Sequence, residues 1–261
     1  MIKRMFSLFV PCYNEEKCIG KNVVKIYEVL KNYQKKNKNF KFEIIVVNDC
    51  STDRTKEIVD KVSKEIKEIK AIHYSGDKPT RRENLIQSFK YAKGDIVGFT
   101  DADLSTDITD LPRLYNEVDD DNTIVIGDRY HHESKVQRSI KRWVISKTLN
   151  YSTRILFFDW TRPFKFTSGS WDHFCGFKAF TKKTILRLLE YTGVGNEQRS
   201  MWWDAEMLIY AEKLGYKIKR IPVTWVEGKE TKLKPRREIN IILYMIKLMI
   251  RMKWMKSTKL G

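Results

Sequence analysis

Residues 43–53 read EIIVVNDCSTD, and residues 95–103 read DIVGFTDAD. Each stretch carries a run of apolar residues and ends in carboxylates, amides or hydroxyls. An unbroken apolar run of this length is typical of a strand that is buried on both faces of a parallel sheet. The polar residues that follow such a strand lie at the carboxyl edge of the sheet, where open α/β sheets bind their ligands. The two stretches therefore predict the fold class and the place of a functional site.

Outward from these runs, short apolar segments alternate with amphipathic ones. The other expected strands are residues 6–10, 69–74, 123–127, 176–180 and 217–223. The expected helices are residues 21–36, 52–66, 82–92, 111–118, 141–158, 181–189 and 204–214, with Ser51 or Thr52 as the cap of the second helix. This alternation predicts an α/β fold, with a mostly parallel sheet and helices on both faces. We expect one domain over residues 1–227 and a basic amphipathic extension over residues 228–261.

The composition fits a globular chain that meets a polyanion. The 261 residues are 42% hydrophobic, which is enough for a full core and excludes wholesale disorder. Fifty Lys and Arg against 33 Asp and Glu give a net charge of +17. Such a charge suggests a nucleic acid, an anionic membrane surface or a phosphorylated substrate, or else solvated Lys on helix faces. The four cysteines have no C-x-x-C spacing, so we expect free thiols rather than a zinc site or a disulfide framework.

Polar clusters follow four of the predicted strands: residues 11–15 (PCYNE), 48–53 (NDCSTD), 101–103 (DAD) and 127–129 (GDR). Asp101 and Asp103 point the same way in an extended segment, so together they could hold Mg²⁺ or Mn²⁺ with substrate phosphates. An acidic turn that caps the next helix is the alternative. Tyr13 could stack on a nucleobase and Glu15 could bind ribose hydroxyls, or the segment could simply cap a helix.

In this order the segments resemble glycosyltransferase family 2, the inverting nucleotide-sugar enzymes with a GT-A fold. Residues 175–180 (CGFKAF) and 202–206 (WWDAE) are similar to the branch of dolichyl-phosphate glucosyl- and mannosyltransferases. The resemblance covers about residues 6–227. Ser105 stands where some mannosyl enzymes have Gln near the metal, which argues against a mannosyl donor. The family's glycine-rich segment is altered to residues 75–82 (SGDKPTRR), in which Lys78 is the expected remnant.

The resemblance implies a role for each matching residue. The nucleobase and ribose would be held by Pro11, Tyr13, Glu15, Val47 and Asp49, with Lys78 nearby. The ribose–diphosphate would be held by Asp101, Ala102 and Asp103, and the two aspartates would be the ligands of Mg²⁺ or Mn²⁺. Arg129 would face a phosphate, Asp204 and Glu206 would line the sugar or acceptor side, and Lys232 would lie near the acceptor phosphate.

The chain's last helix has a membrane-surface pattern. Residues 239–254 place Asn240, Lys247 and Arg251 in one narrow stripe and apolar side chains around the rest. Such a helix could lie in a bilayer interface, with residues 155–164 as a second contact. Packing on the core or on a partner subunit is the alternative. No apolar run reaches the ~20 residues of a membrane span.

The expected function is transfer of a hexose from a nucleotide-sugar to dolichyl or another polyprenyl phosphate. UDP-glucose is the first choice of donor and GDP-mannose the second, and the expected place is the cytoplasmic membrane face, as a peripheral protein. A phosphate acceptor is already ionised at pH 7, so it needs cations more than a base. The candidates are Arg129, Lys232, Arg236 and Arg237. The alternatives are a family member that extends a cell-surface glycan and a basic nucleic-acid-binding protein, although no recognition helix or aromatic–basic strand platform favours the latter.

Overall fold

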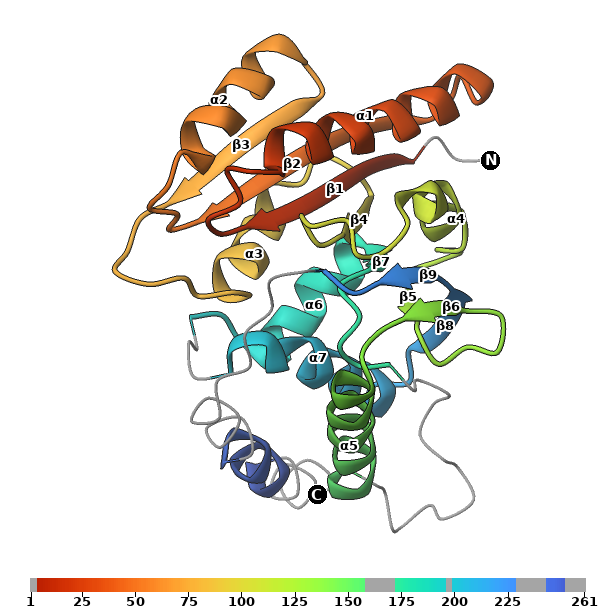
Figure 1. Cartoon of the computed structure of the whole chain (residues 1–261). Coiled ribbons are helices and arrows are strands. Elements are labelled where there is room, and N and C mark those ends of the chain that lie inside the picture. The colour runs from red at the N-terminus through yellow and green to blue at the C-terminus, as the bar shows by residue number, and fades with distance from the viewer. Residues whose placement is uncertain (1–3, 158–171, 196–198, 229–242, 252–261) are drawn as a thin grey trace.

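The computed structural model describes residues 4–157, 172–195, 199–228 and 243–251, and a seven-stranded sheet lies at its centre (Figure 1). The strand order is β3-β2-β1-β4-β7-β5-β8. The strands are β1 (Met5–Cys12), β2 (Lys41–Asp49), β3 (Ile69–Tyr74), β4 (Ile96–Phe99), β5 (Thr123–Asp128), β7 (Lys178–Thr181) and β8 (Lys217–Pro222). Within this described sheet, β7 runs antiparallel to both neighbours and the remaining pairs are parallel. The mostly parallel α/β sheet is confirmed.

Helices cover both faces of the sheet (Figure 1). The described helices are α1 (Ile19–Lys36), α2 (Thr55–Glu65), α3 (Glu83–Ser88), α4 (Leu111–Asn116), α5 (Ile140–Leu156), α6 (Lys182–Thr192) and α7 (Trp203–Lys213). Short 3-10 turns span Phe89–Tyr91, Ile108–Asp110 and Ser200–Trp202. Helices α1 and α4 pack on one face of the sheet, with α2 beside α1, and helices α3, α6 and α7 pack on the other.

The strands are buried on both sides, as their unbroken apolar runs predict. Ile45 and Val47 of β2 pack with α3, α6 and α7, whereas Ile44 and Val46 pack with α1 and α2. Successive side chains of a strand point to opposite faces, so a run without polar alternation fills two cores at once.

Several predicted boundaries differ from the structure, and two of them lie beside the polar segments that follow β2 and precede β7. Helix α2 begins at Thr55, because the Asp53 carboxylate accepts the Thr55 and Glu16 amides at 2.9 and 3.2 Å and holds the preceding residues in a turn. Neither Ser51 nor Thr52 is therefore its cap. Strand β7 begins at Lys178, two residues after the predicted start, and Gly176 before it lies against the Asp101 carboxylate.

A second sheet was not predicted. Strands β6 (Lys135–Gln137) and β9 (Thr224–Val226) pair in parallel and bring Trp225 beside the carboxyl edge of the main sheet. Three-residue strands are too short to show a periodic pattern, and their pairing joins segments far apart in the sequence.

The predicted C-terminal helix is described over residues 243–251, which are helical. Tyr244, Met245 and Leu248 are buried in the core beside α7, whereas Leu243 and Ile250 are more than half exposed. One side of this helix therefore packs on the protein and another side carries exposed apolar residues. Among the described helices, none has the length and apolar character needed to cross a bilayer.

Candidate active site

A cavity of about 600 Å³ lies at the carboxyl ends of the strands. All four predicted polar clusters contribute to its wall: Pro11 at the end of β1 with Tyr13 and Glu15 just after it, Asp49 at the end of β2, Asp101, Ala102 and Asp103 after β4, and Arg129 after β5. The four clusters thus lie together on one cavity. The wall also contains residues that were not predicted, including Arg81, Arg82, Arg138, Arg142, Trp202 and Trp225.

The first two loops are tied together by hydrogen bonds. Asn14 has a left-handed φ of 54°, and its side-chain oxygen accepts the Thr52 amide at 2.8 Å. The Glu15 amide donates to the Thr55 hydroxyl at 2.8 Å. These contacts fix the loop that presents Tyr13, whose side chain is 41% exposed at the cavity.

Asp49 organises the neighbouring turn. Its carboxylate accepts hydrogen bonds from the amide and hydroxyl of Thr80, from the Arg81 amide and from the Asn84 side chain. Most of its acceptor capacity is therefore used within the protein. Neither Val47, whose side chain lies in the core, nor Lys78 is among the described residues of the cavity wall. The 75–82 segment instead places Arg81 and Arg82 there.

The two aspartates of the DAD segment line the cavity and pack against glycines. A Cβ atom on Gly176 would lie 2.2 Å from the Asp101 carboxylate, and one on Gly228 would lie 3.0 Å from that of Asp103. Ser105 holds Asp103 through its amide and hydroxyl at 2.9 and 2.8 Å. Burial raises the pKa of Asp101 to about 6, and Asp103 adds to the rise. Two carboxylates on the wall of one cavity suit Mg²⁺ or Mn²⁺, which prefer oxygen ligands.

Asp204 lies outside the described cavity wall, in a buried ion group behind Arg82. It is fully buried and accepts from Arg82 Nε at 2.7 Å and from Lys178 Nζ at 3.0 Å. Each of its two carboxylate oxygens is thus hydrogen-bonded to a cation of the protein. Asp204 thus contacts Arg82, and Arg82 in turn lines the cavity.

Glu206 lies outside the described cavity wall. It is fully buried and contacts Arg199 at 3.2 Å, the Tyr244 hydroxyl at 2.7 Å and Arg251 at 2.9 Å. Two of these partners, Tyr244 and Arg251, belong to the 243–251 helix. Glu206 therefore anchors that helix to α7.

Arg129 is occupied by Asp172. The Asp172 carboxylate accepts from Arg129 Nε at 2.6 Å and from Nη2 at 2.7 Å, a bidentate pair. Although burial disfavours its charge, the Arg129 guanidinium keeps the pKa of Asp172 below its usual range. Arg129 lines the cavity but turns its forked edge to the protein.

In Arg138, unlike in Arg129, the Nε and Nη2 edge of the guanidinium is not paired with a carboxylate of the described residues. Its guanidinium lies 5.2 Å from the Trp225 ring and 5.5 Å from the Tyr130 ring. Its Nε and Nη2 atoms are buried and have no hydrogen-bond partner among the described residues. Nε and Nη2 form the fork that binds a carboxylate or phosphate in a bidentate manner. Nothing in the sequence separates Arg138 from the other basic residues, because the Tyr130 and Trp225 contacts arise from the unpredicted small sheet.

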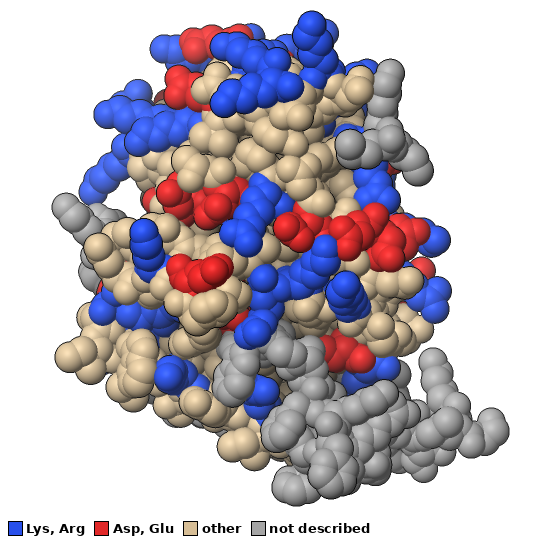
Figure 2. Space-filling view, turned by 90° about the vertical axis from the view of Figure 1, so that its right-hand side faces the viewer, with Lys and Arg blue, Asp and Glu red and all other residues tan. Residues whose placement is uncertain are grey.

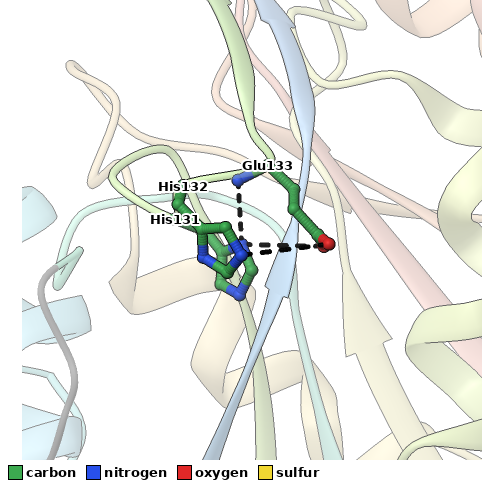
Figure 3. A group of neighbouring side chains, drawn as sticks. All are labelled: His131, His132 and Glu133. Carbon is green, nitrogen blue, oxygen red and sulfur yellow. Dashed lines mark hydrogen bonds and ion pairs between the residues drawn. The ribbon is translucent and has the colours of Figure 1, made fainter.

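A separate group of titratable side chains lies on the turn after β5, where His131, His132 and Glu133 approach one another (Figure 3). Both histidines lie 3.9 Å from the glutamate oxygens, and their rings stack at 4.4 Å with planes 26° apart. Imidazole lone pairs lie in the ring plane, so nearly parallel rings do not aim at one ion. The carboxylates of the cavity are the better metal ligands.

The remaining predicted cations, Lys232, Arg236 and Arg237, lie outside the described residues. On the face that Figure 2 shows, Lys and Arg are interspersed with Asp and Glu rather than gathered in one basic surface. This mixture does not favour a nucleic-acid groove on that face.

Comparison with known proteins identifies relatives. The chain is 31% identical over 234 residues to glycosyltransferase AglD of Haloferax volcanii, covering 89% of this chain and 35% of that protein. It is 31% identical to a dolichyl-phosphate beta-glucosyltransferase of Trichomonas vaginalis, covering 94% and 72%. The human dolichyl-phosphate beta-glucosyltransferase is 28% identical, with 89% and 70% covered. The chain thus spans about a third of AglD and about 70% of the other two.

Solved structures share the fold. A mannosyltransferase from Pyrobaculum calidifontis, in complex with GDP-Man and Mn²⁺, superimposes with a TM-score of 0.59 at 19% identity, over 95% of this chain and 64% of that one. TarS of S. aureus, residues 1–349 in complex with UDP, gives a TM-score of 0.54 at 18% identity, over 94% and 65%. The fold is the GT-A fold. The family model described as glycosyl transferase family 2 matches residues 7–188, and the chain belongs to that family.

Proposed function

We propose that the chain transfers a hexose, with inversion, from a nucleotide-sugar to dolichyl or another polyprenyl phosphate. The observation that carries this proposal is the pairing of two kinds of group in one cavity. The Asp101 and Asp103 carboxylates suit the metal and diphosphate of a donor, and the unpartnered fork of Arg138 suits the phosphate of an acceptor. The names of the relatives, several of which are dolichyl-phosphate glucosyltransferases, support the same substrates.

The donor half rests on the first three strand ends. Tyr13 offers a face to the nucleobase, and Glu15 and Asp49 line the same wall. Asp101 and Asp103 would hold Mg²⁺ or Mn²⁺, which when bound would stabilise the negative charge on the departing diphosphate. UDP-glucose is the favoured donor because the relatives' names specify glucose, with GDP-mannose second.

The acceptor half needs no general base. One oxygen of the acceptor phosphate, already ionised, forms a bond to the anomeric carbon while the bond from that carbon to the diphosphate oxygen breaks. This single displacement inverts the anomeric centre. Asp204, held between Arg82 and Lys178, is not needed to remove a proton. Arg138 positions the attacking phosphate, with Arg129 behind it on the Trp225 ring.

The test compares Arg138→Gln with wild-type protein. Loss of a charged bidentate contact should raise the acceptor KM roughly 10- to 100-fold, because such hydrogen bonds contribute about 1.5–3 kcal/mol. Binding of UDP should stay within about threefold. Arg187→Gln, an exposed arginine on α6, is the matched control.

The acceptor class is tested by offering a polyprenyl phosphate and the free polyprenol with the same donor. We expect transfer to the phosphate alone. Equal transfer to the alcohol would contradict a phosphate acceptor and would favour the family members that extend a glycan hydroxyl. Equal loss of UDP binding in Arg138→Gln would assign that arginine to the donor instead.

The proposed place of action is the cytoplasmic face of a membrane, with the protein bound peripherally to an anionic surface. Exposed apolar side chains on α5 (Ile140, Val144, Tyr151 and Ile155) and on residues 243–251 (Leu243, Ile246 and Ile250) support this. Both helices lie at the end of the molecule away from β1–β3 (Figure 1). All four cysteines are free thiols, as is usual in a reducing compartment.

A further inference from the structure

A second cavity, of about 370 Å³, lies between α5, the turn after β5 and strand β8. None of its described wall residues lines the active-site cavity. Helix α5 contributes to both walls, with Lys147 and Tyr151 on the second cavity and Ser146 and Leu149 on the active-site cavity. The two cavities are therefore separate sites that share one helix.

The wall of the second cavity carries cations and, among its described residues, no carboxylate. The Arg220 guanidinium donates to the buried Asp128 at 3.1 Å, so the charge of this arginine is balanced from behind. Lys147 differs, because its ammonium lies 4.4 Å from the Trp143 ring and 6.0 Å from the Tyr130 ring and is paired with no carboxylate of the described residues. A hollow with an unbalanced ammonium group favours an anionic ligand.

The turn after β5 adds a neutral donor to the same wall. The Glu133 amide donates to His131 Nδ1 at 3.2 Å (Figure 3). A neutral imidazole that accepts at Nδ1 has its proton on Nε2, so His131 supplies an N–H group. The Asp128 carbonyl fixes this turn by accepting from the His131 amide at 3.1 Å and from the Ser134 hydroxyl at 2.6 Å. An ammonium, a guanidinium and an imidazole N–H together suit a phosphomonoester, whose three terminal oxygens are strong acceptors.

The side chains beside the cavity indicate that this phosphate belongs to a lipid. Tyr151, on the wall, is 49% exposed, and Val144 and Ile155 on the same side of α5 are 49% and 67% exposed. A free phosphate gains nothing from these apolar side chains. A membrane lipid would place its phosphate in the cavity and its acyl chains against them.

We infer that the second cavity binds the phosphomonoester headgroup of a membrane lipid that is not the sugar acceptor. The inference goes beyond the proposed function, because it concerns another cavity and assumes no hexose transfer. A lipid bound there would hold α5, and with it one wall of the active-site cavity, at the membrane surface.

The experiment measures flotation with phosphatidylcholine vesicles that contain either phosphatidic acid, a phosphomonoester, or phosphatidylglycerol, a phosphodiester, at matched surface potential. The readout is the ratio of the two partition coefficients, which cancels the general attraction of a basic protein. Wild-type protein should prefer phosphatidic acid roughly 10-fold or more, since hydrogen bonds to charged groups contribute this much. Equal partitioning of wild-type protein between the two kinds of vesicle would overturn the inference.

The variants assign the preference to this cavity. Lys147→Gln should lose it, whereas the control Lys21→Gln, which removes the same charge from an exposed position on α1, should keep it. Lys147→Arg retains a charged donor and should keep most of the preference, so it separates recognition from folding if Lys147→Gln is unstable. An undiminished preference in a folded Lys147→Gln, or its loss in Lys147→Arg and Lys21→Gln alike, would overturn the inference.

Two further measurements separate the sources of the phosphate. Short-chain phosphatidic acid should raise the melting temperature of wild-type protein but not of Lys147→Gln, and inorganic phosphate at the same concentration should not raise either. Equal stabilisation by inorganic phosphate would contradict a lipid site. The KM for polyprenyl phosphate in Lys147→Gln should stay within about threefold of wild type, and a tenfold rise would assign the cavity to the acceptor instead. Failure of wild-type protein to transfer hexose would overturn the proposed function but not the vesicle comparison.

Discussion

At the scale of single residues, the site depends on the absence of side chains as much as on their presence. Gly176 lies against the Asp101 carboxylate, and a methyl group there would lie 2.2 Å from one carboxylate oxygen. Real Cβ atoms do not approach an oxygen this closely, so the carboxylate would have to turn away. The position of Asp101, a proposed metal ligand, thus depends on the missing side chain of Gly176, which comes just before β7.

We therefore predict that Gly176→Ala folds but loses the donor site. Its melting temperature should stay close to that of wild type, because the displaced atoms belong to one flexible side chain. The apparent affinity for UDP in the presence of Mn²⁺, measured from the rise in melting temperature with ligand concentration, should fall at least about tenfold. Gly76→Ala is the control, since its Cβ would meet Cys50 Sγ at 3.3 Å and lies outside the described cavity wall. An unchanged Mn²⁺-dependent shift in Gly176→Ala would contradict the assignment of Asp101.

The sequence located residues by strand ends but could not show their partners. Asp101 and Asp103 were found because a carboxylate directly after a buried strand reaches the carboxyl edge. Glu206 looks equivalent to Asp204 in the WWDAE segment, yet two residues apart on a helix point in different directions. Asp204 therefore meets Arg82 at the site, and Glu206 meets Arg199 and the 243–251 helix behind it.

At the scale of elements, β1 to β5 were predictable because each is an apolar run closed by polar residues. The antiparallel direction of β7 and the small β6–β9 sheet were not, because strand direction and long-range pairing leave no periodic signal. The unpredicted sheet matters, since it brings Trp225 under Arg129 and Arg138.

Helix α5 is held to the segment before β7 by one buried pair. The Asn150 side-chain oxygen accepts both the His173 amide at 3.0 Å and the ring Nδ1 at 2.9 Å, which requires the Nδ1–H form of the ring. Burial lowers the pKa of His173 to about 4, and Lys178 and Arg154 add to the effect against the opposing pull of Asp172. The ordinary histidine value is about 6.5.

The sign of this shift predicts acid sensitivity. Between about pH 6.5 and pH 4 the unfolded chain binds a proton at His173 that the folded protein does not. The stabilisation is complete above the unfolded pKa and is lost as pH falls toward the folded one, by at most about 3 kcal/mol. Because Asp101 titrates in the opposite direction, the comparison must be with His173→Gln. Its deficit in unfolding free energy should shrink from pH 7 to pH 4.5, while the exposed control His132→Gln should show no such change; equal deficits at both pH values would contradict the prediction.

At the scale of the whole molecule, the +17 charge and the exposed apolar side chains both suit the anionic membrane surface that we propose as a partner. Basic residues attract an anionic leaflet over a distance of about a Debye length, and apolar side chains then enter the interface. Such a surface would bring the cavity to an acceptor whose phosphate lies at the membrane and whose chain lies within it.

We predict that Leu243→Asp with Ile250→Asp releases the protein from vesicles that contain anionic lipid. Both side chains are more than half exposed, so the change spares the buried Tyr244, Met245 and Leu248 of the same helix. Burying one such side chain contributes about 1.5–3 kcal/mol, so the partition coefficient should fall at least about tenfold while UDP binding is unchanged. Leu214→Asp, which changes an exposed leucine after α7, is the control and should float as wild type does. Raised salt should weaken the binding of all three proteins, because it screens the charge common to them. If the double variant floats with vesicles as fully as wild type, the 243–251 helix is not the membrane contact, and the exposed face of α5 becomes the surface to change next.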